Sequence, residues 1–141
     1  MAIYLVDSNV WLELILGQSQ STVAADFFAR TPIQKLAITD YAVHSILLRL
    51  LRGKQFNAAR DFAADVAKPN RVQIVSHTPE RLTAVLRHVE TLKLDFDDAY
   101  QYEAAELLDA TIVTFDADFN STPRRGISPA LAELSTESDS E

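Results

Sequence analysis

The chain's 141 residues suffice for one domain with a sizeable core, and its 48% hydrophobic and 23% charged residues are typical of a globular protein. It has no cysteine, which excludes a disulfide framework, a thiolate zinc site and a cysteine nucleophile. No apolar run approaches the roughly 18 residues that cross a membrane, so we expect a cytoplasmic protein. The net charge of −7 says little about a nucleic-acid partner, because four acids fall in residues 133–141, which we expect to form a disordered acidic tail.

Short apolar runs alternate with helical patterns along the chain. In order, the sequence predicts a strand at 2–6, helices at 9–16 and 23–30, a strand at 35–39, helices at 40–54 and 55–67, a strand at 72–75, helices at 78–92 and 94–108, a strand at 111–115, and a short strand or turn at 127–132. The helix at 40–54 is apolar nearly all round, so we expect it to be buried.

This alternation predicts an α/β domain over residues 1–132, with a short, mainly parallel central sheet flanked by helices in three layers. Connections in such sheets are right-handed crossovers, so helices should cover both faces. Ligands of this fold class bind beyond the carboxyl ends of the strands. Polar residues that directly follow a strand are therefore the first candidates for a functional site.

Carboxylates from three separate stretches of sequence fall at this predicted edge. Asp7 follows the first strand, Asp116 follows the fourth strand, and Asp95, Asp97 and Asp98 crowd the first turn of the helix at 94–108. Unpaired acids at one place repel one another and raise each other's pKa values. The usual relief is a hard divalent cation such as Mg²⁺ or Mn²⁺, which prefers carboxylate oxygens and, beside a phosphodiester, activates water and stabilises the leaving oxygen.

Each acid also has a structural explanation. Asp7 can be a turn residue and helix cap, Asp95 a helix N-cap, Asp97 a favourable charge at a helix start, and Asp118 the cap of a short turn. Asp98 is harder to explain in this way, because it lies on a face that continues into a probable core face of the helix. The joint placement of the acids, rather than any single one, indicates a cation site.

Four stretches together resemble the PIN domain, the metal-dependent ribonuclease fold of VapC-type toxins: IYLVDSNVWLEL, ITDYAVHSILLRLL, LDFDDAYQYEAA and TIVTFDADF. The resemblance spans roughly residues 2 to 132, and Asp7, Asp98 and Asp116 match the family's acidic positions. It implies an endoribonuclease that uses Mg²⁺ or Mn²⁺ held by these three residues. It also implies RNA as substrate, a small antitoxin protein as partner, and a homodimer.

The sequence departs from the family at the helix that follows the second strand, where a Glu is normal and His44 and Ser45 stand here. The resemblance extends to a PIN subgroup with a His-Ser pair at this point. His44 can ligate a metal or contact a phosphate with Asp40 fixing its tautomer, or it can be a core histidine bonded to Asp40 or to a backbone carbonyl. Ser45 can hold a water on a metal, as a weaker substitute for a carboxylate.

Other polar and aromatic residues near the predicted edge have two interpretations each. Arg124 and Arg125 can bind RNA phosphates or be ordinary surface charges. Tyr100 and Tyr102 can stack on bases or belong to the core. Trp11 and the pair Phe27–Phe28 can form an interface with an antitoxin or a second copy, although core packing is the better explanation for most of them.

Two hypotheses follow from these residues. One is a metal-dependent endoribonuclease, the toxin of a toxin–antitoxin pair, with Asp7, Asp98 and Asp116 as catalytic and metal-binding residues and Asn9, His44, Ser45, Asp95 and Asp118 as supporting or substitute groups. The other is a catalytically weak or inactive PIN scaffold that binds RNA or a protein. A haloacid-dehalogenase-type phosphatase is set aside, because it needs a second Asp where Asn9 stands.

Overall fold

The computed structural model describes residues 2–132, and the predicted acidic tail at 133–141 lies outside this range. Five parallel strands form one sheet in the order β3-β2-β1-β4-β5. Their bounds are β1 Tyr4–Val6, β2 Leu36–Thr39, β3 Gln73–Val75, β4 Thr111–Val113 and β5 Gly126–Ile127. The α/β fold with a parallel sheet is as the sequence predicts, although the last strand is shorter and begins earlier than the predicted 127–132.

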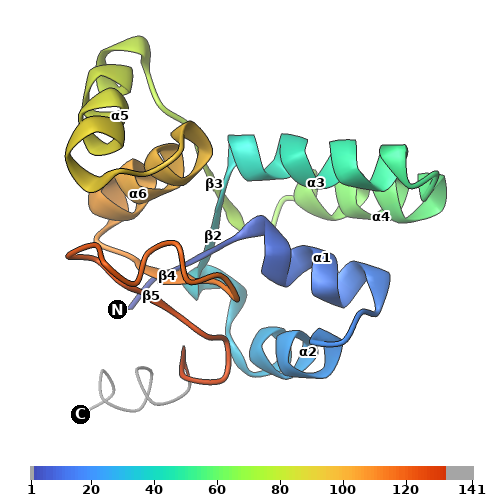
Figure 1. Cartoon of the computed structure of the whole chain (residues 1–141). Helices are drawn as coiled ribbons and strands as arrows, with labels where there is room; N and C mark the ends of the chain where they lie inside the picture. Colours follow the sequence, from blue (N-terminus) through green and yellow to red (C-terminus); the bar gives the residue numbers. More distant parts are fainter. Residues whose placement is uncertain (1, 133–141) are drawn as a thin grey trace.

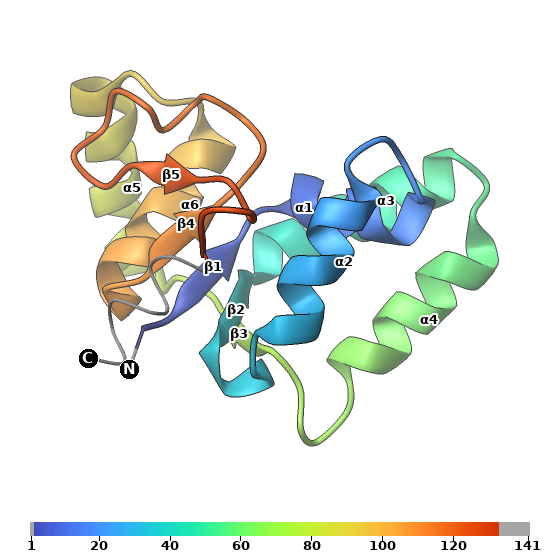
Figure 2. The ribbon, with the colours of Figure 1, turned by 90° about the horizontal axis from the view of Figure 1, so that it is seen from below.

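Six α-helices and one 3-10 turn connect the strands within the described residues. They are α1 Ser8–Leu16, α2 Ser21–Arg30, η1 Ile33–Lys35, α3 Asp40–Arg52, α4 Phe56–Val66, α5 Pro79–Leu92 and α6 Phe96–Leu108. Figures 1 and 2 show the sheet between two groups of helices, with α5 and α6 on one side and α1 to α4 on the other. None of these helices combines the length and the apolar character needed to cross a bilayer.

The central strand β1 explains why the fold has three layers. Its residues Tyr4, Leu5 and Val6 are all completely buried, as expected for a parallel strand that is covered on both faces. Because side chains alternate along a strand, Tyr4 and Val6 join the core beneath α1 to α4, and Leu5 joins the core beneath α5 and α6. The strand that ends at Asp7 is therefore buried between two hydrophobic cores.

Helix α3 differs from its prediction, which expected burial on nearly all sides. Ile46 and Leu50 are fully buried, but Leu48 and Leu51 are 50% and 48% exposed. The helix packs against α1, α4 and β2, and nothing in residues 2–132 covers its remaining face. The expectation of a buried helix was wrong, because apolar composition alone does not reveal how many neighbours a helix has.

Candidate active site

Asp7 is held by hydrogen bonds at the carboxyl end of β1. It is the N-cap of α1, and its Oδ1 accepts a hydrogen bond of 2.7 Å from the Ser8 amide. Its Oδ2 accepts hydrogen bonds from Thr114 Oγ1 at 2.8 Å and from Asn9 Nδ2 at 3.3 Å. The cap prediction for Asp7 and its placement at the candidate site are therefore compatible, because one oxygen caps the helix while the other faces β4.

Thr114 and Asn9 form a clamp that fixes this carboxylate. The Thr114 hydroxyl donates to Asp7 and accepts from Asn9 Nδ2 and from the Asp116 amide, both at 3.0 Å. Asn9 Oδ1 in turn accepts from the Phe115 amide at 3.2 Å. Asn9 thus lies beside Asp7, as the sequence suggests, and it joins the start of α1 to the segment that follows β4.

A small polar cavity of about 30 Å³ opens beside Asp7 at this edge of the sheet. Its lining comes mainly from the first turns of α1, α3 and α6, together with the end of β2: Asp7, Ser8, Thr39, Tyr41, Ala42, Ser45, Asp97, Asp98 and Gln101. Three helix N-termini contribute partial positive charge here, but the carboxylates of Asp7, Asp97 and Asp98 contribute full negative charges when ionised, so the lining favours a cation. The same volume admits a water molecule or a small ion.

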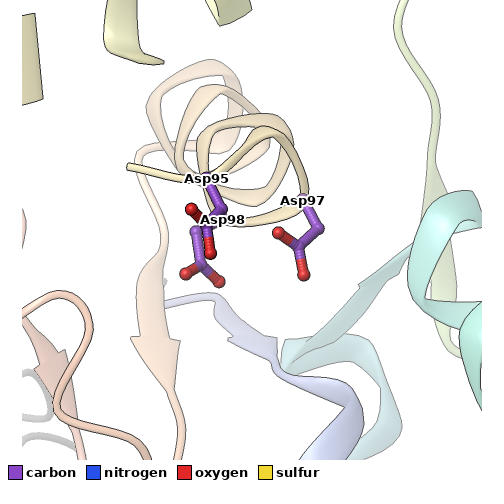
Figure 3. Close-up of side chains that lie close together, drawn as sticks. All are labelled: Asp95, Asp97 and Asp98. Carbon is purple, nitrogen blue, oxygen red and sulfur yellow. The ribbon is translucent and has the colours of Figure 1, made fainter. Parts of the chain in front are cut away.

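Three further acids lie at the start of α6. Oxygen atoms of Asp95, Asp97 and Asp98 all lie within 4.8 Å of one another, and Figure 3 shows the three side chains on the side of the helix end that faces the sheet. Asp95 occupies the N-cap position of α6, as predicted, but its side chain makes no capping hydrogen bond. Its carboxylate is therefore not committed to the helix end and is available to the cluster.

The acids of the site influence each other's protonation. Burial raises the pKa of Asp7, and the charge of Asp116 adds to that rise, while hydrogen bonds from Thr114 and Ser8 oppose it. Burial, with the charges of Asp97, Asp118 and Asp7, raises the pKa of Asp98 from 3.8 to about 8. Clustered carboxylates that resist ionisation are what a divalent cation relieves, and the donors are all hard oxygens. The residues present therefore fit Mg²⁺ or Mn²⁺.

Asp116 and Asp118 take different places around this centre. Both are exposed. Asp116 lines an adjoining open hollow with Thr114 and Gly126, and it acts on Asp7 through its charge. Asp118 acts on Asp98 through both charge and a hydrogen bond. The segment after β4 therefore brings two acids close enough to act on Asp7 and Asp98: Asp116, expected as a metal-binding residue, and Asp118, expected as a supporting group.

Of the two residues expected where the resemblance implies a Glu, Ser45 lines the cavity with Asp7 and Asp98. His44 is exposed and is not part of the cavity lining. Asp40 is not its partner: the Asp40 carboxylate accepts hydrogen bonds of 2.8 Å from the Tyr41 amide and from the Tyr100 hydroxyl. The interpretation of His44 as a core histidine paired with Asp40 was wrong, because the residue points away from the core.

The basic residues and tyrosines proposed from the sequence lie mostly elsewhere. Arg124 donates to the Ala110 carbonyl at 2.9 Å and to Asp109 Oδ1 at 3.2 Å, at the end of α6 that is remote from the cavity. It thus stabilises a helix C-terminus, while Arg125 is exposed. Tyr100 and Tyr102 are only 8% and 2% exposed, so both belong to the core.

Gln101 is the residue that the sequence interpretation missed. It is 6% exposed and lines the cavity beside Asp7, and it is among the groups that oppose the burial-driven rise in the pKa of Asp7. Its Nε2 nevertheless has no hydrogen bond of normal geometry within residues 2–132. The available signal was an amide three residues after Asp98, on the same face of the helix.

A parallel sheet with an acidic, oxygen-rich site at its carboxyl edge defines a class of α/β protein suited to binding a divalent cation. The PIN domain family model matches residues 4–125, and the chain belongs to this family. A search of curated proteins found no match to the sequence.

Three solved structures share the fold. VapC20 of Mycobacterium tuberculosis, a toxin that cleaves the sarcin–ricin loop, is 20% identical with a TM-score of 0.75, covering 89% of this chain and 99% of its own. A toxin–antitoxin complex from Klebsiella pneumoniae is 18% identical with a TM-score of 0.72, covering 92% and 98%. PAE2754 from Pyrobaculum aerophilum is 17% identical with a TM-score of 0.67, covering 99% and 97%. At these identities, the likeness establishes the fold alone.

Proposed function

We propose that the protein is a metal-dependent endoribonuclease that hydrolyses RNA phosphodiester bonds, and that it is the toxin of a toxin–antitoxin pair. The observation that carries this proposal is the meeting of Asp7 and Asp98 at one cavity, with pKa values raised by burial and by neighbouring acids. Membership of the PIN family and the shared fold with a ribonuclease toxin support it.

Asp7 and Asp98 are the residues that would hold Mg²⁺ or Mn²⁺ directly, with Asp116 and Asp118 contributing charge from the next segment. When bound, such an ion supplies Lewis acidity that activates water and stabilises the leaving oxygen. The Thr114–Asn9 clamp holds the Asp7 carboxylate in one orientation, so little reorganisation is needed when the substrate binds. Once a cation offsets the carboxylates, the partial positive charge of the α1, α3 and α6 N-termini would favour the scissile phosphate.

The test is cleavage of a mixed RNA pool by the full chain with Mn²⁺, with Mg²⁺ and with chelator. The variants Asp7→Asn and Asp98→Asn keep the side-chain shape and remove the charge. Asp61→Asn, an exposed acid on α4, is the matched control. We expect metal-dependent cleavage that both site variants lose and that the control retains. Metal-dependent cleavage that survives both site substitutions would contradict the assignment of the site.

One observation favours a second candidate function. No acid from α3 reaches the cavity, where the neutral Ser45 and Gln101 lie instead. A site with one carboxylate fewer binds a cation more weakly, so a non-catalytic PIN scaffold that binds RNA or a protein is the alternative. Metal binding only at millimolar concentration, together with RNA binding without cleavage, would support the scaffold over the nuclease.

The antitoxin partner has a candidate surface on the opposite side of α1. A largely apolar cavity of about 440 Å³ is lined by Trp11, Phe62 and Val72, among others. The ring centroids of Trp11 and Phe28 are 4.4 Å apart, and the Trp11 Nε1 has no hydrogen-bond partner within residues 2–132. Phe27, in contrast, is fully buried in the core. We place an apolar side chain of the antitoxin in this cavity; the homodimer and the cytoplasmic location remain predictions.

A further inference from the structure

Two exposed aromatic rings lie beside the acidic cavity. Tyr41, at the start of α3, is 43% exposed, and Phe96, at the start of α6, is 44% exposed. Their ring centroids are 6.2 Å apart. Tyr41 itself lines the cavity with Asp7 and Asp98, and Phe96 directly precedes the acids of α6. The pair is thus continuous with the candidate active site.

A buried tyrosine holds the two rings in place. The ring of Tyr100 lies 5.5 Å from that of Tyr41 and 6.1 Å from that of Phe96. Its hydroxyl donates to Asp40 on α3 at 2.8 Å and accepts from the His77 amide at 3.2 Å. The first turns of α3 and α6 are therefore tied together beneath the exposed rings, and the aromatic surface is preorganised.

We propose that Tyr41 and Phe96 form a stacking surface for an unpaired base of an RNA strand whose scissile phosphate lies at Asp7 and Asp98. This inference rests on the proposed function. Only a sugar separates a phosphate from its base, so a phosphate in the cavity brings a neighbouring base to the rings. Bases stack on aromatic side chains when they are unpaired, which makes single-stranded or loop RNA the substrate class.

The charges around the rings favour a base over the alternatives. Asp40 and Asp95 lie beside the rings and outside the cavity lining, so their charges disfavour a further phosphate group there, whereas a stacked base is neutral. A stable protein interface buries about 800 Å² on each partner. Two half-exposed rings offer far less apolar surface than that, but they match the size of one or two bases.

The test measures binding of a single-stranded oligoribonucleotide that carries the fluorescent base 2-aminopurine, with the full chain in the Asp7→Asn background so that the strand is not cut. Tyr41→Ala and Phe96→Ala remove the rings, while Tyr41→Phe and Phe96→Tyr keep them. Phe56→Ala is the matched control, because Phe56 is a 53% exposed aromatic residue at the start of α4, outside the cavity lining.

We expect each alanine variant to weaken binding about tenfold and to lose the fluorescence quenching, in the range measured for base–aromatic stacking. The ring-conserving variants and Phe56→Ala should bind as the parent does, and a fully paired duplex should bind more weakly. In the cleaving chain, the alanine variants should raise KM with little change in kcat, because stacking contributes equally to the ground and transition states.

The outcomes separate the two proposals. Ring variants that bind and cleave single strands as the parent does, or a duplex bound as tightly as a single strand, would overturn the stacking surface and leave the nuclease intact. If the Asp7→Asn chain with both rings intact binds no RNA, both the stacking surface and the nuclease proposal are overturned. Ring variants that keep RNA binding but lose an antitoxin would assign the rings to a protein interface and overturn the inference.

Discussion

Replacing Asp98 by Asn should stabilise the metal-free protein at neutral and alkaline pH. In the native chain, burial and the charges of Asp97, Asp118 and Asp7 raise the pKa of Asp98 from 3.8 to about 8. Between these values the native state retains a proton that the unfolded chain has lost. The free energy of unfolding contributed by this group therefore falls as pH rises from about 4 to about 8.

The magnitude follows from the pKa and the exposure of the cluster. Without screening, the rise would correspond to about 6 kcal/mol, since each pKa unit is worth about 1.4 kcal/mol. Asp95, Asp97 and Asp118 are exposed, so water and salt screen much of the repulsion, and we expect about 2 kcal/mol. The amide of Asn resembles the protonated carboxyl group and does not titrate, so Asp98→Asn should recover this amount at pH 8.

The assay is urea unfolding with chelator at pH 5, 6.5 and 8, for the parent, Asp98→Asn and the exposed control Asp61→Asn. The parent and control should lose stability with rising pH, and Asp98→Asn should lose less, with a residual slope because the pKa of Asp7 is raised too. Mn²⁺ at pH 8 should stabilise the parent more than Asp98→Asn. Equal pH slopes in the parent and Asp98→Asn, or a less stable variant at pH 8, would refute the reasoning.

Three further substitutions probe the support of the site. Thr114→Val removes the donor to Asp7 and should cost about 1–3 kcal/mol in urea unfolding and weaken Mn²⁺ binding in calorimetry; unchanged binding would contradict the clamp. Gly126→Ala brings a Cβ within 2.8 Å of Thr114 Cγ2, so it should lower the free energy of unfolding by about 1–3 kcal/mol and reduce RNA cleavage by displacing Thr114. Gly53→Ala is the control, because its Cβ makes only ordinary contacts, and equal effects of the two substitutions would contradict this reasoning. Gln101→Leu should leave metal-free stability equal or up to about 1 kcal/mol higher and lower cleavage about tenfold, and a marked loss of stability would indicate a structural role instead.

The strand ends could be predicted because a short local sequence pattern specifies them. An apolar run followed at once by Asp7 marks a buried strand that ends at a polar edge, and the rule for parallel sheets then places such ends together. Asp98 is predictable for the same reason, since a helix that runs back across the sheet begins at that edge. The element order and the direction of the chain were therefore sufficient to predict that both acids lie at one edge of the sheet.

Other features depend on contacts that local pattern does not encode. The sequence could not tell which of Asp116 and Asp118 approaches Asp98, because the turn after β4 decides it. Arg124 follows the acidic segment closely in sequence, yet it lies at the far end of α6 and bonds Ala110 and Asp109. The exposed face of α3 was missed because burial depends on neighbours that composition does not specify.

Neutral side chains lie beside the acids in the lining of the cavity. Ser45 and Gln101 line the cavity where a further acid would add to the repulsion between Asp7 and Asp98. A site with fewer negative charges attracts a cation less strongly, but it also desolvates and assembles at lower cost in the metal-free state. Gln101 can additionally donate from its unpartnered Nε2 to a phosphate oxygen, which a carboxylate cannot do. If the proposed function holds, this neutral pair would favour binding of metal and phosphate together over binding of the metal alone.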